Sequence, residues 1–146
     1  MTEPVESPHQ DGVPRPSIGL RRIVQAFGHS RAGLASAWRT EGAFRQELIA
    51  AAVLFPVACL LPVTLLERAM LIGSVVFVMV VELLNSSIEA TVDRISLERH
   101  PLSRHAKDVG SAAVLLAIVI PLLTWGAIAG PIALAAIHNF PGGETP

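Results

Sequence analysis

An apolar segment between residues 69 and 90, AMLIGSVVFVMVVELLNSSIEA, is long enough to cross a lipid bilayer and yet contains two carboxylates, Glu82 and Glu89. A charged side chain at the centre of a bilayer costs about 2.5–3.5 kcal/mol on insertion scales. Membrane spans keep such residues where they face protein or water, and they are usually functional there. The segment therefore predicts a transmembrane helix whose acidic face lies against other protein.

Two more apolar stretches accompany this segment, and 51% of all residues in the chain are hydrophobic. Residues 48–66 and 110–137 contain no charged side chain. At about 1.5 Å of rise per residue, each stretch can cross a hydrocarbon core of about 30 Å. We therefore predict three membrane spans, at residues 47–66, 69–95 and 108–137.

Prolines and a short link shape the expected spans. Pro56 and Pro62 are expected to kink the outer half of the first span. In the third span, Pro121 and Pro131 are expected to introduce a kink and an early end. Only Glu67–Arg68 separate the first span from the second, so the second should return antiparallel to the first.

The residues before the first span predict a surface helix. Residues 17–39 place apolar side chains at helical spacing and arginines on the other faces, a pattern typical of a basic amphipathic helix on a membrane surface. Gly28 and Gly33 are expected to divide this helix into two pieces. Residues 1–16, rich in proline, are expected to be disordered, and residues 138–146 to form a C-terminal tail. The chain therefore predicts an all-α fold with three transmembrane helices preceded by an amphipathic surface helix.

The positions of the basic residues predict how the chain is oriented. The net charge of −1 gives no reason to expect nucleic-acid binding, and the single cysteine, Cys59, excludes an internal disulfide. Of the eleven basic residues, six precede the first span, four lie between the second and third spans, and Arg68 lies between the first two. The positive-inside rule then places the N-terminus and the second loop in the cytoplasm and the C-terminus outside. Because three helices cannot enclose a polar site by themselves, we also expect a homo-oligomer.

The second span has an acidic face. Glu82, Glu89 and Asp93 share one narrow helical stripe because they are spaced by seven and then four residues. Asn85 and Ser86 flank this stripe. Such groups can simply join neighbouring helices through hydrogen bonds and ion pairs. Their concentration on one stripe favours a functional site instead.

The chemistry of these side chains suggests a site for a metal ion and phosphates. Carboxylate oxygens suit Mg²⁺, which proteins commonly hold with one or two carboxylates and the phosphates of a substrate, and Glu41 and Glu89 are candidates. Glu82, desolvated inside its span, suits a general base. The sequence has no glycine-rich phosphate loop of the soluble nucleotide-binding types. These patterns alone do not name a reaction.

Three motifs resemble those of the prokaryotic diacylglycerol kinase family. They are VELLNSSIEATVDR at 81–94, HAKDVGSAAVLL at 105–116 and AWRTEGAFRQE at 37–47, and the resemblance covers about residues 20–129. It implies a small homotrimeric integral membrane kinase of the bacterial cytoplasmic membrane. Such an enzyme transfers the γ-phosphate of ATP, with Mg²⁺, to the primary hydroxyl of diacylglycerol and gives phosphatidic acid.

The resemblance also implies roles for individual residues. Glu82 would be the general base on the lipid hydroxyl, and Glu41 and Glu89 would hold Mg²⁺ with the nucleotide. Asn85 and Ser111 would position Glu82 and the lipid. The full set of implied ATP contacts is Arg22, His29, Glu41, Glu89, Glu98, Arg99, His100, Lys107 and Asp108.

Two other functions remain open from the sequence. Undecaprenol kinases share the signature and differ in the acceptor lipid, although the RQE, LSRHAKDVG and GSAAV stretches are more similar to the diacylglycerol branch. A non-enzymatic membrane subunit or small transporter, in which the acidic stripe conducts ions, is the more distant alternative.

Overall fold

The computed structural model describes residues 19–95 and 100–139, and these ranges contain four α-helices. The helices are α1 (Leu20–Thr40), α2 (Gly42–Leu60), α3 (Leu65–Ile95) and α4 (Pro101–His138). By length and composition, α2, α3 and α4 can each cross a membrane. The predicted all-α class, with three apolar helices after an amphipathic one, is confirmed. The predicted N-terminal tail 1–16 and residues 140–146 of the C-terminal tail lie outside the described residues.

The chain forms two compact units, one ending at Ala35 and the other beginning at Ser36. In the first unit, α1 exposes both apolar side chains such as Phe27 and basic ones such as Arg31. Helix α1 passes through Gly28 and Gly33 without a break, so the predicted division into two pieces is wrong. A glycine inside a helix costs only about 1 kcal/mol relative to alanine, which the neighbouring helical residues can offset.

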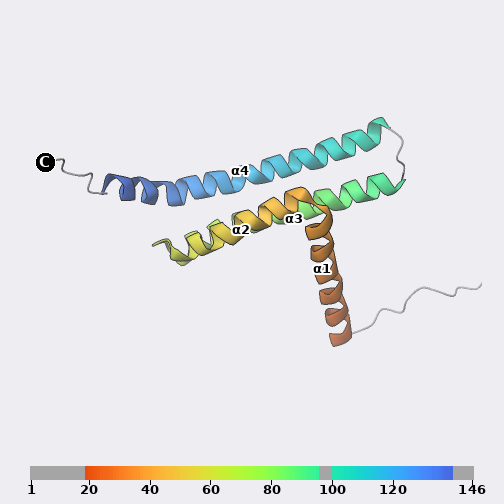
Figure 1. Cartoon of the computed structure of the whole chain (residues 1–146), viewed down its shortest axis with the longest axis horizontal. Helices are drawn as coiled ribbons and strands as arrows, with labels where there is room; N and C mark the ends of the chain where they lie inside the picture. Colours follow the sequence, from red (N-terminus) through yellow and green to blue (C-terminus); the bar gives the residue numbers. More distant parts are fainter. Residues whose placement is uncertain (1–18, 96–99, 140–146) are drawn as a thin grey trace, which may run out of the picture. The chain divides into compact units, whose positions relative to one another are not determined.

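The second unit is built around α3, which packs against both α2 and α4. Figure 1 shows α3 and α4 running antiparallel along most of their length. The buried positions of α3 begin at Leu71 and, apart from the adjacent pair Ser74 and Val75, recur at intervals of three or four residues, which places them on one stripe. The buried residues of the facing helices are mostly small, namely Ala51 and Ala58 on α2 and Gly110 and Ala117 on α4. Small residues allow helix backbones to approach closely, as is typical of packing within membranes.

The turn between α2 and α3 lies at Leu61–Thr64, not at the predicted link Glu67–Arg68. Helix α2 stops at Leu60 because the residue before Pro62 is disfavoured in helical geometry and adopts an extended conformation. Glu67 lies in the first turn of α3, where its Oε2 accepts hydrogen bonds from the backbone N–H and the hydroxyl of Thr64 at 2.8 and 2.7 Å. This reciprocal cap begins α3 four residues earlier than the predicted span.

Arg68 forms two hydrogen bonds to backbone carbonyls at the end of α2 and in the turn that follows it. Its Nε donates to the carbonyl oxygen of Ala58 at 3.1 Å, and its Nη2 donates to that of Leu61 at 3.1 Å. The carbonyl of Ala58 lies in the last turn of α2, where such groups lack a helical partner, while that of Leu61, just after the helix, also accepts a hydrogen bond from the backbone N–H of Val63 at 2.9 Å. The one basic residue between the first two spans therefore caps a helix terminus.

Helix α4 begins with His100 and Pro101. The Nδ1 atom of His100 accepts a hydrogen bond from the backbone N–H of Leu102 at 3.2 Å, and proline is well suited to the first helical position. Pro121 and Pro131 lie inside α4, which continues to His138, so the predicted early end is wrong. Prolines are tolerated within membrane helices because neighbouring groups can satisfy the freed carbonyl oxygen.

Candidate functional site

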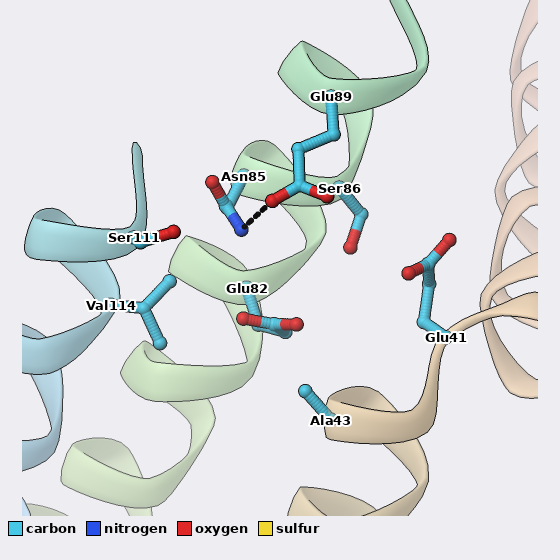
Figure 2. A pocket seen from close by; sticks show the side chains of 8 residues that line it. All are labelled: Glu41, Ala43, Glu82, Asn85, Ser86, Glu89, Ser111 and Val114. Carbon is cyan, nitrogen blue, oxygen red and sulfur yellow. Dashed lines mark hydrogen bonds between the residues drawn. The ribbon is translucent and has the colours of Figure 1, made fainter. Parts of the chain in front are cut away.

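The second unit contains an open pocket of about 340 Å³ where α2, α3 and α4 converge. Figure 2 shows its side chains, which come from the start of α2, the second half of α3 and the early part of α4. The lining residues are Glu41, Ala43, Glu82, Asn85, Ser86, Glu89, Ser111 and Val114. Five residues with roles implied by the sequence resemblance are therefore brought together, from segments that are 70 residues apart at their extremes, Glu41 and Ser111.

Glu82 is the most enclosed carboxylate of the pocket. Only 5% of the residue is exposed, and Asn85, one helical turn further along α3, is 8% exposed. Glu82 therefore lies against protein, as its position within an apolar run indicated, while Asp93 at the far end of the same stripe is exposed. The carboxylates of Glu89 and Glu41 both repel Glu82 electrostatically, so the pocket concentrates negative charge. Such a site favours the binding of metal cations and of anionic ligands that bind as complexes with a metal cation.

Asn85 and Glu89, one helical turn apart on α3, are joined by a hydrogen bond. Asn85 Nδ2 donates this hydrogen bond to Glu89 Oε1 at 3.1 Å, which Figure 2 marks with a dashed line. Asn85 Oδ1 is buried and has no hydrogen-bond partner among the described residues. The sequence resemblance led us to expect Asn85 to position Glu82; the hydrogen bond that the structure shows is to Glu89.

Glu41 reaches the pocket from the corner between α1 and α2. Its backbone is extended at the N-terminal cap of α2, and its Oε1 accepts a hydrogen bond from the hydroxyl of Thr40 at 3.0 Å. Arg45 supports this corner because its Nη1 donates to the carbonyl oxygens of Trp38 and Arg39, both at 3.2 Å. The corner therefore holds a carboxylate opposite the acidic face of α3, although 41 residues separate Glu41 from Glu82 in the sequence.

The pocket offers carboxylate ligands that suit Mg²⁺. In the parts of the chain that the structure describes, no group of three histidine, cysteine, aspartate or glutamate side chains is arranged to hold a metal ion alone. Glu41 and Glu89 nevertheless supply the hard carboxylate oxygens that Mg²⁺ prefers. These residues fit a cation whose remaining ligands are phosphate oxygens and water, which is how Mg²⁺ is commonly bound.

Lys107 and Asp108 lie in the first two turns of α4. Lys107 Nζ donates to Asp93 Oδ1 on α3 at 2.6 Å, while Asp108 forms a longer ion pair of 3.6 Å with Arg104. The side chains of both pairs are partly or largely exposed, so they remain accessible to a soluble ligand. A lysine ammonium near the pocket offers a positive charge for a phosphate group.

Lys107, Asp108 and His100 are not among the residues that line the pocket. His100 is exposed, and its imidazole caps the beginning of α4. Glu98 and Arg99 lie outside the described residues. Arg22 and His29 are exposed residues of α1 in the unit that ends at Ala35, and their assignment stays a prediction.

Glu47 is a further acidic residue that the sequence reasoning missed. Its Oε2 is buried without a hydrogen-bond partner among the described residues, and its carboxylate lies close enough to Glu82 for electrostatic repulsion. The available signal was its position at the start of an uncharged span, six residues after Glu41. By itself, that position indicates only where the first span begins, because the α2 sequence does not reveal which residues of α3 lie opposite it.

Together, the helices and the pocket define a small helical membrane protein with an acidic site between its spans. The family model for prokaryotic diacylglycerol kinase matches residues 28–129. The chain belongs to this family, so it is a multi-pass membrane protein and a kinase.

Named relatives agree with the family match. The diacylglycerol kinase of Pseudomonas aeruginosa is 54% identical over 110 residues, which cover 75% of this chain and 89% of the relative. That of Escherichia coli is 53% identical over 109 residues, with the same shares covered. The diacylglycerol kinase of Haemophilus influenzae is 46% identical over 112 residues, covering 77% of this chain and 95% of the relative.

Proposed function

We propose that this protein is a diacylglycerol kinase that transfers the γ-phosphate of ATP to the primary hydroxyl of diacylglycerol and releases phosphatidic acid and ADP. The family membership and the high identity to relatives named for this activity support the substrate. The observation that carries the proposal structurally is the pocket itself, in which the enclosed Glu82 faces two further carboxylates.

In the proposed reaction, Glu82 accepts the proton of the lipid hydroxyl while the hydroxyl oxygen attacks the γ-phosphorus of ATP. The bond between the γ-phosphorus and the bridging oxygen to the β-phosphorus breaks, and its electron pair leaves with ADP. Catalysis of this kind depends mainly on positioning and on charge neutralisation. A buried carboxylate beside polar groups can supply the first of these without a soluble-type phosphate loop.

Glu41 and Glu89 are proposed to hold Mg²⁺ together with the nucleotide phosphates. The ion, when bound, neutralises the phosphate charge that the acidic pocket would otherwise repel. Lys107 is proposed to contact the phosphates after separating from Asp93, and Ser111 to contact the lipid. The remaining proposed ATP contacts are Arg22, His29, Glu98, Arg99, His100 and Asp108.

The orientation and assembly of the protein are also proposals. The excess of basic residues before α2 and around the α3–α4 connection supports a cytoplasmic N-terminus and an outer C-terminus in the bacterial inner membrane. ATP would then reach the pocket from the cytosol. A homotrimer is proposed because α4 leaves most of its apolar side chains exposed, including Leu115 and Leu122, which can contact either lipid or a second copy.

The acceptor lipid is tested by supplying purified protein in mixed micelles with Mg-ATP and either diacylglycerol or undecaprenol. We expect phosphate to be incorporated mainly into diacylglycerol. A preference of about tenfold for the polyprenol, equivalent to about 1.4 kcal/mol, would assign undecaprenol kinase activity instead. Absence of ATP-dependent phosphorylation of either lipid, together with an ion flux that Glu82→Gln alters, would identify a non-enzymatic ion-conducting protein.

A further inference from the structure

We infer that Gly110 is a positioning residue for the proposed reaction, because its lack of a side chain sets the orientation of the Asn85 amide and, through it, of the Glu89 carboxylate. This inference rests on the proposed role of Glu89 in binding Mg-ATP. In this view, Gly110 on α4 determines how the side chain of Asn85 on α3 is aligned. Neither the charge pattern nor the helical periodicity of the sequence indicated such a role for Gly110.

Helix α4 packs closely against α3 at Gly110. Gly110 is buried, and a Cβ atom added to it would overlap Asn85 Oδ1 and lie 3.4 Å from Asn85 Cγ. The other α4 glycines, Gly126 and Gly130, have no atom within 4 Å of the corresponding position. The requirement for glycine at residue 110 is therefore local and concerns one side chain.

The surroundings of the Asn85 amide determine which way it points. Its Nδ2 donates to Glu89 Oε1 at 3.1 Å, while its Oδ1 is buried without a conventional hydrogen-bond donor. The Cα hydrogen of Gly110 that a Cβ would replace points towards Oδ1 and offers a weak C–H···O contact. If the amide were turned over, its oxygen would face the Glu89 carboxylate, and the two oxygens would repel each other.

A methyl group at residue 110 should therefore disturb the amide more than the fold. Asn85 Oδ1 is the far end of a short flexible side chain, which can rotate away from an added Cβ. That rotation would remove the hydrogen bond to Glu89, leaving the carboxylate without the donor that orients it. The helix itself gains from the change because alanine is a better helix former than glycine. If Gly110 positions Asn85, Gly110→Ala should therefore weaken the use of Mg-ATP without lowering the stability of the protein.

The test compares Gly110→Ala with Gly126→Ala, a matched change in the same helix, in mixed micelles. We expect Gly110→Ala to raise KM for Mg-ATP by about tenfold or more, the effect typical of losing a residue that orients a metal ligand. Its thermal unfolding midpoint should not fall. The side-chain amide signals of Asn85 in nuclear magnetic resonance spectra should also move. Gly126→Ala should match the wild-type protein in all three measurements.

The variants Asn85→Ala and Gly110→Ala/Asn85→Ala complete a double-mutant cycle. Adding Gly110→Ala to Asn85→Ala should change KM for Mg-ATP by no more than about twofold, because the colliding oxygen is already absent. The same cost in both backgrounds would overturn the inference, as would a Gly110→Ala enzyme indistinguishable from Gly126→Ala. If Gly110→Ala does not fold, recovery of folding in the double variant supports the collision with Asn85, and failure to recover refutes it.

Binding of Mg-ATP by Glu89→Gln distinguishes failure of the proposed function from failure of this inference. If Glu89 has no part in nucleotide binding, Glu89→Gln will bind Mg-ATP as well as the wild-type protein does. If only the inference is wrong, Glu89→Gln will be impaired while Gly110→Ala remains normal.

Discussion

Lys107 on α4 and Asp93 on α3 form an ion pair of 2.6 Å that joins the end of one helix to the beginning of the next. The ammonium group of Lys107, which we propose as a phosphate ligand, is therefore already engaged by Asp93. Nucleotide binding must therefore compete with Asp93 for Lys107, and this competition should be measurable.

Asp93→Asn should lower KM for Mg-ATP at low salt, because the substitution removes both the competing partner and one negative charge near the phosphates. The effect should fade as ionic strength rises, since the two side chains are partly exposed and screened by salt. Steady-state kinetics across a salt series provide the measurement. A higher KM in Asp93→Asn would mean that Asp93 orients Lys107 for the nucleotide, contrary to this expectation.

Glu82→Gln should abolish turnover while leaving ATP binding largely intact. The amide keeps the shape of the side chain in its enclosed position but cannot accept the hydroxyl proton, so kcat should fall by about 10²–10⁴-fold. Lipid phosphorylation in micelles gives kcat, and equilibrium titration with Mg-ATP gives the affinity. Activity within a few-fold of the wild-type protein would exclude Glu82 as the general base.

Glu89→Gln should impair binding of Mg-ATP, because one of the two carboxylates proposed to hold the cation is lost. The substitution also replaces the charged acceptor of the Asn85 hydrogen bond with a neutral amide. Titration of the purified variant with Mg-ATP measures the loss. Equal affinity in Glu89→Gln and the wild-type protein would reject the metal assignment.

Arg68→Met should destabilise the protein without changing KM for either substrate. The substitution removes two charge-assisted hydrogen bonds to the end of α2, each typically worth about 1.5–3 kcal/mol when a charged group is involved. Thermal unfolding in micelles is the measurement. Arg104→Gln is the control, because Arg104 is exposed and its ion pair among the described residues is with Asp108 of its own helix. Equal midpoints for the two variants would show that the α2–α3 turn does not depend on Arg68.

The pattern of charged and apolar residues was sufficient to predict much of this protein. Apolar runs of bilayer length predicted three membrane helices, and an acid inside one of them predicted a face turned towards protein. Both results follow from solvation, because exposing a long apolar run to water or a carboxylate to lipid is costly whichever particular residues the neighbouring helices supply. The prolines were harder to interpret, since the cost of Pro131 depends on groups around α4.

Only the tertiary structure decided which residues of different helices meet. Periodicity places Asn85 on a face of α3, but it does not show that Gly110 of α4 lies against its amide oxygen or that Glu89 receives its hydrogen bond. It also did not reveal that Glu47 lies near Glu82, or that Arg68 caps the helix before it. Each of these contacts depends on the separation and register of two helices, and a helix sequence specifies its own faces without specifying its neighbour's.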